Sequence, residues 1–250
     1  MTFRTLLNHA FNAFKRNLNL IVFLSVPFLI SFPLAFFLPN YSSLSGIFLR
    51  FSSVGLDLSF LQGAFFIGMV LVSLLLFSFA IAAINVVIKS QRRLVALTTD
   101  DLHLVEVGTF KLFFIYLLAF ALVFIANLLL FEHTFQGIAF IGSRSLGMLF
   151  AFLVSLVVLF APQAVIIDEL KISQALDRSL VTIRRHFKDC VLFIVFAAFL
   201  LIVNTLIFME LGKNGLVFSR YLSLIPNALI ILPFLEALKT QIYLSKYTLL

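Results

Sequence analysis

Long uncharged stretches separated by short charged ones dominate this chain of 250 residues. A helix needs about 17–25 apolar residues to cross a bilayer, whose hydrocarbon core is about 30 Å thick. The pattern therefore predicts an all-α, polytopic integral membrane protein. Its six transmembrane helices are expected at about residues 18–38, 64–88, 112–131, 146–167, 190–209 and 221–238. The sixth span is the shortest, because its uncharged part lies only between Arg220 and Glu236.

Three segments with helical periodicity precede the first, third and fifth spans. They lie at about residues 2–16, 100–110 and 171–188, and the first and third have an apolar stripe beside polar faces. This pattern is typical of amphipathic helices in the membrane interface. Residues 14–18 match residues 183–187 in character, each with an apolar residue, two cations, a polar residue and an apolar one. The match predicts one unit used three times, consisting of a surface helix, a span and a return span.

Composition and charge agree with a membrane location. The chain is 62% hydrophobic and 12% charged, with a mean hydropathy of +1.16, whereas soluble domains are about half apolar and a quarter charged. Cytoplasmic loops collect Lys and Arg, and 14 of the 18 basic residues fall on one side of the predicted spans. These are Arg4, Lys15, Arg16, Lys89, Arg92, Arg93, Lys111, Lys171, Arg178, Arg184, Arg185, Lys188, Lys239 and Lys246. We therefore expect a multi-pass protein of the cytoplasmic membrane with both termini in the cytoplasm.

This asymmetry also accounts for the net charge of +7 without a nucleic-acid partner. The apolar stretch at 18–38 is longer than the core of a signal peptide, so we interpret it as a retained span. The loop at 40–62 is rich in serine, and Leu44, Ile47 and Phe48 recur in it at helical spacing. It is expected to cover the opposite interface.

Candidate chemistry is sparse. The predicted spans place small polar side chains, and no ionisable ones, in their interiors. Asn127 and Asn204 are candidates for the polar lining of a cavity, although such residues more often join spans to one another. The single cysteine, Cys190, excludes an intrachain disulfide. Neither metal-ligand spacings nor nucleophile motifs occur, so no catalytic residue, metal ligand or cofactor is predicted.

One basic cluster stands beside the fifth span. Arg184, Arg185 and Lys188 would lie at the cytoplasmic surface, where each cation near an anionic leaflet contributes about 1 kcal/mol. They are candidates for contact with lipid headgroups, and they also help to fix the topology.

Residues 162–187 read PQAVIIDELKISQALDRSLVTIRRHF, an apolar span end, an acidic pair and then a helix. This segment resembles a group of six-span membrane proteins that includes the YciC-like proteins and the membrane domain of some glycerophosphodiester phosphodiesterases. The resemblance implies a six-span membrane domain, and it does not imply the phosphodiesterase reaction. The matching residues are Pro162, Asp168, Glu169, Ala175, Leu176, Arg178 and Ser179.

Three functions are compatible with these patterns. The leading hypothesis is a non-enzymatic accessory or scaffold module that contacts membrane lipids and either a membrane-protein partner or a second copy of itself. The alternative is a transporter of a lipid or an apolar small molecule. A third is an intramembrane enzyme that uses cytoplasmic residues such as His103 and Asp168.

Overall fold

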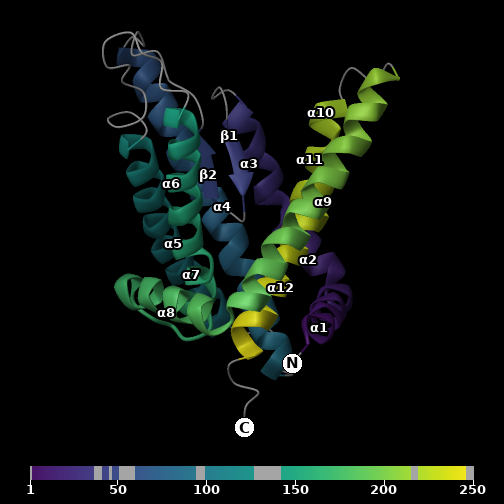
Figure 1. Ribbon diagram of the computed structural model, residues 1–250. Coiled ribbons are helices and arrows are strands. Elements are labelled where there is room, and N and C mark those ends of the chain that lie inside the picture. The colour runs from purple at the N-terminus through teal and green to yellow at the C-terminus, as the bar shows by residue number, and fades with distance from the viewer. Residues whose placement is uncertain are drawn as a thin grey trace.

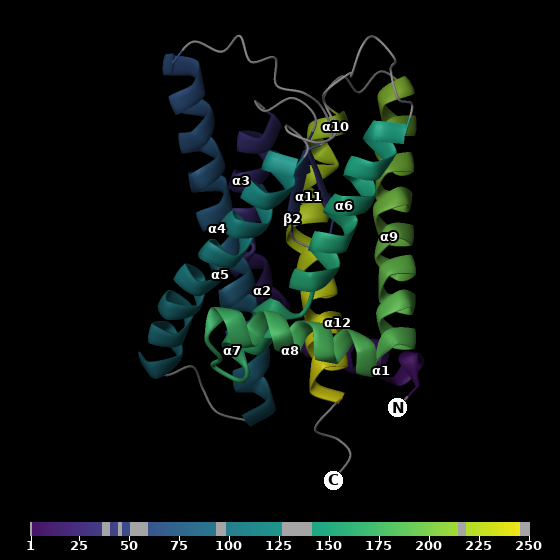
Figure 2. The ribbon, with the colours of Figure 1, turned by 60° about the vertical axis from the view of Figure 1, so that its left-hand side comes forward.

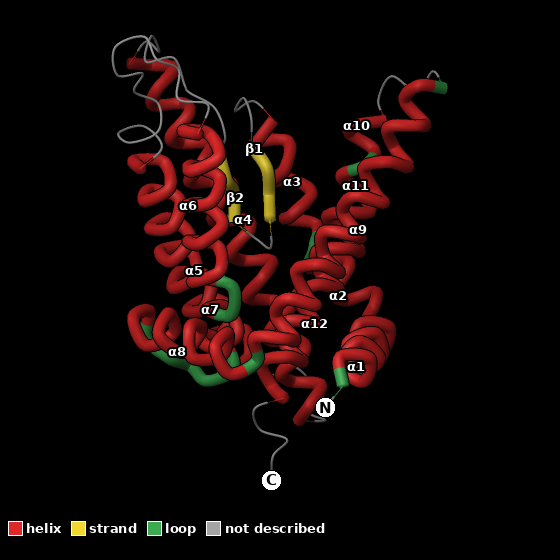
Figure 3. Tube along the Cα trace, in the orientation of Figure 1, coloured by secondary structure: helices red, strands yellow, loops and turns green. Residues whose placement is uncertain are grey.

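The computed structural model describes residues 2–36, 41–44, 47–50, 60–93, 99–126, 142–214 and 219–245. Helices make up nearly all of this part of the chain (Figures 1 and 3). In chain order they are α1 (Phe3–Arg16), α2 (Leu18–Leu24), α3 (Val26–Phe36), α4 (Phe60–Arg93), α5 (Thr99–Ala126), α6 (Gly142–Val158), α7 (Ala161–Ile166), α8 (Ile172–Arg185), α9 (Phe187–Lys213), α10 (Ser219–Leu222), α11 (Leu224–Pro226), the π-helix η3 (Asn227–Ile231) and α12 (Leu232–Leu244).

The amphipathic helices α1 and α8 lie at the same end of the molecule, the lower end in Figures 1 and 2. We call this end the base. Helix α8 runs across the long helices, and α1 bends by 82° into the helix that follows it. Long helices rise from the base, and the pieces α10, α11, η3 and α12 together return to it (Figure 1).

Four of the described helical segments are long and apolar enough to cross a membrane, and the bent pair that starts with α1 is a fifth candidate. The four are Ile67–Ser90, Thr99–Ala126, Leu149–Ile166 and Phe187–Lys213. The expectation of a helical protein with several helices long and apolar enough to span a membrane is confirmed. A short antiparallel hairpin, β1 (Tyr41–Leu44) and β2 (Ile47–Arg50), is the exception.

That hairpin differs from the helical spacing expected at Leu44, Ile47 and Phe48. Tyr41 is paired with Arg50 and Leu44 with Ile47 in its register. Apolar residues three and four positions apart are compatible with two short strands as well as with a helix, because periodicity cannot separate the two over so few residues.

Helix α5 also differs from expectation. A surface helix at 100–110 and a span at 112–131 were expected, but Thr99–Ala126 is one continuous helix. Lys111 causes no interruption, because its ammonium reaches the carbonyl oxygen of Leu170 at 3.3 Å. Gly108 and Thr109 are already buried, so packing begins before the point where a break was expected.

Three of the helical paths are broken next to prolines, and Pro27 follows the first break, between α2 and α3. Pro162 follows the break between α6 and α7, and Pro226 and Pro233 flank the π-helix η3. Proline lacks an N–H group and clashes with the carbonyl four residues before it, so a helix bends or ends there.

The best-buried part of the structure lies toward the base, where α4, α7 and α12 meet. Every residue of α4 from Ala80 to Ser90 is buried. Helix α9 is the opposite case, because only 11% of its most apolar window is buried. The arrangement is therefore closed at the base, while α9 shows most of its apolar surface to the surroundings.

Candidate functional site

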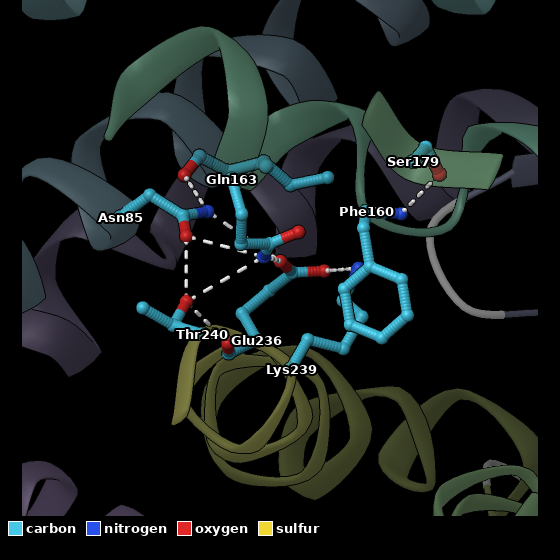
Figure 4. A network of polar contacts seen from close by, with 8 residues as sticks. Asn85, Phe160, Gln163, Ser179, Glu236, Lys239 and Thr240 are labelled. Carbon is cyan, nitrogen blue, oxygen red and sulfur yellow. Dashed lines mark hydrogen bonds and ion pairs between the residues drawn. The ribbon is translucent and has the colours of Figure 1, made fainter. Parts of the chain in front are cut away.

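Five buried polar side chains meet between α4, α7 and α12. They are Asn85 of α4, Gln163 of α7, and Glu236, Lys239 and Thr240 of α12, and we call them the polar cluster (Figure 4). Taken as whole residues, none of the five is more than 4% exposed. Burying a polar or charged side chain costs free energy unless it forms hydrogen bonds or ion pairs, so the contacts within the cluster are described first.

The amides and the hydroxyl form a closed set of bonds. The Gln163 Nε2 donates to Asn85 Oδ1 at 3.2 Å and to Glu236 Oε2 at 3.3 Å. The Thr240 hydroxyl donates to Asn85 Oδ1 at 2.7 Å, with the Glu236 carbonyl as a second acceptor in reach at 2.8 Å. Asn85 Nδ2 donates to the Ile81 carbonyl at 2.9 Å. Side-chain hydrogen bonds thereby join α4 to α7, α4 to α12 and α7 to α12.

The charged members form an ion pair inside α12. The Lys239 ammonium lies 2.5 Å from Glu236 Oε1, and the two side chains are 1% and 5% exposed. Glu236 is the ammonium's one polar contact in the part of the chain that the structure describes, and Gln163 Oε1 has no hydrogen-bond partner there. The pair keeps the charges together, and the amide donors reduce the cost of burying the carboxylate.

The sequence predicts Glu236 at the interfacial end of the sixth span and Lys239 in the tail that follows it. In the structure α12 continues to Leu244, and both side chains are buried in the polar cluster, which was not predicted from the sequence. The available signal was their spacing of three residues on an otherwise apolar helix, which puts the two charges on one face.

A second set of contacts holds the loop between α7 and α8. The Lys89 ammonium, from α4, lies 2.8 Å from Glu169 Oε1 and 2.9 Å from the carbonyl oxygen of Ile166. Glu169 has a φ of 56°, in the left-handed region, where a non-glycine residue costs about 1–2 kcal/mol. The ion pair with Lys89 helps to offset this cost and fixes the loop against α4.

Helix α12 reaches the same loop. The Tyr243 hydroxyl donates to Asp168 Oδ2 at 2.6 Å, and Arg178 Nε lies 3.8 Å from the same oxygen. At the break between α6 and α7, the backbone N–H of Phe160 donates to Ser179 Oγ of α8 at 3.0 Å. Residues that carry the family resemblance thus serve here to join α7, α8 and α12.

The cavity candidates from the sequence lie elsewhere. Asn127 is outside the described residues. Asn204 of α9 is 9% exposed, and its Nδ2 donates to the carbonyl oxygen of Ser223 at 3.0 Å. This bond ties α9 to the segment between α10 and α11, which fits the packing role rather than a cavity lining.

The basic cluster lies where α8 joins α9, and Arg184, Arg185 and Lys188 are all exposed. No group of three His, Cys, Asp or Glu that could hold a metal ion occurs among the described residues. The two residues suggested for an intramembrane enzyme have separate partners, since His103 lies 3.8 Å from Glu106 and Asp168 contacts Tyr243.

Comparison of the chain with protein-family models, with curated proteins and with solved structures finds no match.

Proposed function

We propose that this chain is a multi-pass protein of the cytoplasmic membrane that serves as a non-enzymatic accessory or scaffold module. The observation that carries the proposal is the polar cluster, whose side chains come from three helices and bond one another in a buried environment. Bonds of this kind fix the relative positions of helices in a membrane. The fixed assembly then presents its outer surface and its base to lipids or to other membrane proteins.

The proposed topology has six spans, with α2 and α3 as the first and the broken path from α10 to α12 as the sixth. The base faces the cytoplasm, because α1 and α8 both end there in paired cations, Lys15–Arg16 and Arg184–Arg185. Both termini then lie on the cytoplasmic side.

The proposed repeat is supported by how α1 and α8 enter the helices that follow them. Each has 14 residues. The junction residues have similar backbones, with φ −123° and ψ 31° at Asn17 and φ −112° and ψ 35° at His186. All three return paths also contribute to the polar cluster, with Asn85 from α4, Gln163 from α7, and Glu236, Lys239 and Thr240 from α12. We infer one surface helix, span and return span used three times.

Cysteine accessibility tests the topology. In a Cys190→Ser background, Lys188→Cys places a thiol at the basal end of α9, and Glu210→Cys places a matched one near its other end. A membrane-impermeant maleimide added to intact cells should label the cysteine at 210 and spare the cysteine at 188. The reverse labelling would overturn the proposed orientation.

Co-purification tests the accessory role. The full chain is extracted gently into nanodiscs, and mass spectrometry identifies what accompanies it, with an unrelated multi-pass protein prepared in parallel as the control. We expect a stoichiometric membrane-protein partner or a defined homo-oligomer. Movement or conversion of a substrate by the purified chain alone would reject the accessory role.

A second candidate is transport of a lipid or an apolar small molecule. It is favoured by the position of the buried pair Glu236–Lys239 beside two broken helical paths, since discontinuous helices commonly frame transport sites. Flux through proteoliposomes that is lost when the pair is neutralised in the double variant Glu236→Gln, Lys239→Met, but kept in Thr205→Ala on an exposed face of α9, would favour this function. Equal flux in protein-free liposomes would exclude it.

A further inference from the structure

A groove lies between α2, α4 and α5, apart from the polar cluster. Its volume is about 660 Å³, within the range of about 300–1,000 Å³ that is usual for ligand pockets. Apolar side chains from all three helices form most of its wall, among them Leu20, Leu24, Leu75, Phe79 and Val105. It suits an apolar occupant.

The groove is recessed and opens sideways. Ala83, Val86 and Val87 of α4 belong to its wall and are buried, so they form a floor. Phe23 and Leu102 also line it and are 71% and 67% exposed, so they form a rim. A molecule dissolved in the bilayer can therefore enter from the flank of the protein.

The two ends of the groove differ chemically. Along α4 its wall extends from Leu75 to Val87, roughly 18 Å at the rise of an α-helix. Along α5 it includes Asp101 and Glu106, which lie in the first two turns of that helix, at the base. The wall of the groove is thus apolar along its length, and two acidic residues, Asp101 and Glu106, belong to it at the basal end.

We propose that this groove binds a membrane phospholipid with a cationic amine in its headgroup, of the phosphatidylethanolamine class. One acyl chain lies along the wall between Leu75 and Val87, and the ammonium group lies near Asp101 and Glu106. Two negative charges at the mouth attract an ammonium group and repel a purely anionic headgroup. The exposed cations Arg184, Arg185 and Lys188, at the junction of α8 and α9, would instead attract anionic headgroups.

Lipid retention in nanodiscs of equal phosphatidylethanolamine and phosphatidylglycerol tests this proposal. The full chain is re-extracted in mild detergent, and the lipid that stays bound is measured by native mass spectrometry. We expect about fivefold enrichment of phosphatidylethanolamine, as follows from about one effective charge interaction near a membrane surface. Equal retention of the two lipids, or an apolar helix of another protein cross-linked to Leu102, would overturn the proposal.

Two variants separate the headgroup from the tail. Glu106→Gln removes one of the two negative charges through an exposed side chain and should lower the preference while total bound lipid stays the same. Ala83→Phe fills the floor and should remove the retained lipid, whereas Val195→Phe, on an exposed face of α9, should not. Unchanged preference in Glu106→Gln would overturn the headgroup assignment even if Ala83→Phe failed to fold. Failure of the partner search above would leave these outcomes unaffected.

Discussion

Removing the ammonium group of Lys239 tests whether the polar cluster holds the base together. Lys239→Met keeps the length of the side chain but leaves the carboxylate of Glu236, 5% exposed, without its cation. Breaking a buried pair in this way typically costs about 3–5 kcal/mol. In a chain of this size each kcal/mol lowers the melting temperature by roughly 2–4 °C. We therefore expect a large drop in thermal stability.

The chain carries its own reporter for this measurement. Cys190 is its single cysteine and is 2% exposed, so a thiol-reactive fluorescent dye reports its exposure on heating. The matched control is Lys213→Met, which removes an ammonium 3.0 Å from Glu210 in a pair whose side chains are 62% and 64% exposed. Exposed pairs of this kind contribute about 0.2–1 kcal/mol, so its melting curve should move little.

A double variant then distinguishes charge from packing. Glu236→Gln combined with Lys239→Met removes both charges and keeps an oxygen that can accept from Gln163. Most of the lost stability should return, because no uncompensated charge stays buried. The reasoning is refuted if Lys239→Met melts no earlier than Lys213→Met, or if the double variant is as unstable as the single one.

Two further substitutions test the packing and the loop contacts around the polar cluster, each read by the same melting assay. In Gly108→Ala the added methyl would lie 2.2 Å from Ile166 Cδ1, so this buried side chain must turn away at a cost of about 0.5–1.5 kcal/mol, whereas Gly68→Ala meets nothing within 4 Å. Both variants gain helix propensity, so Gly68→Ala should be neutral or stabilising and Gly108→Ala should melt earlier than Gly68→Ala. Equal melting of the two would contradict the tight packing at Gly108. Tyr243→Phe removes the hydroxyl that lies 2.6 Å from Asp168 and should cost about 1.5–3 kcal/mol. An unchanged melting temperature would show that this bond does not hold α12 to the loop.

The helices could be read from the sequence because apolar length and amphipathic periodicity are local properties. The segments expected at 2–16 and 171–188 correspond closely to α1 and α8, since a stripe of apolar residues and a terminal pair of cations define each. The continuity of α5 could not be read in the same way. Gly108 and Thr109 are buried in it, and Gly108 lies against Ile166 of the distant helix α7, a contact that no local pattern indicates.

The polar cluster could not be predicted from the sequence for a related reason. Asn85 and Gln163 look like ordinary small or medium polar residues within apolar stretches, and nothing local indicates that both face Glu236. Their bonds join residues 78, 73 and 151 positions apart. Sequence periodicity predicts which face of a helix is buried, but which other helix packs against that face depends on how all the helices are arranged.

The same separations set an order of events during synthesis. Ribosomes add about 5–20 residues per second, so Glu236 emerges roughly 8–30 s after Asn85, from which it is 151 residues away. Asn85 lacks the acid and the hydroxyl of α12 for this whole interval, and Gln163, which emerges about halfway through it, lacks them for the second half. A nascent chain that stalls before α12 would expose this unfinished polar surface, a feature by which membrane proteases and insertion chaperones could distinguish it from the completed protein.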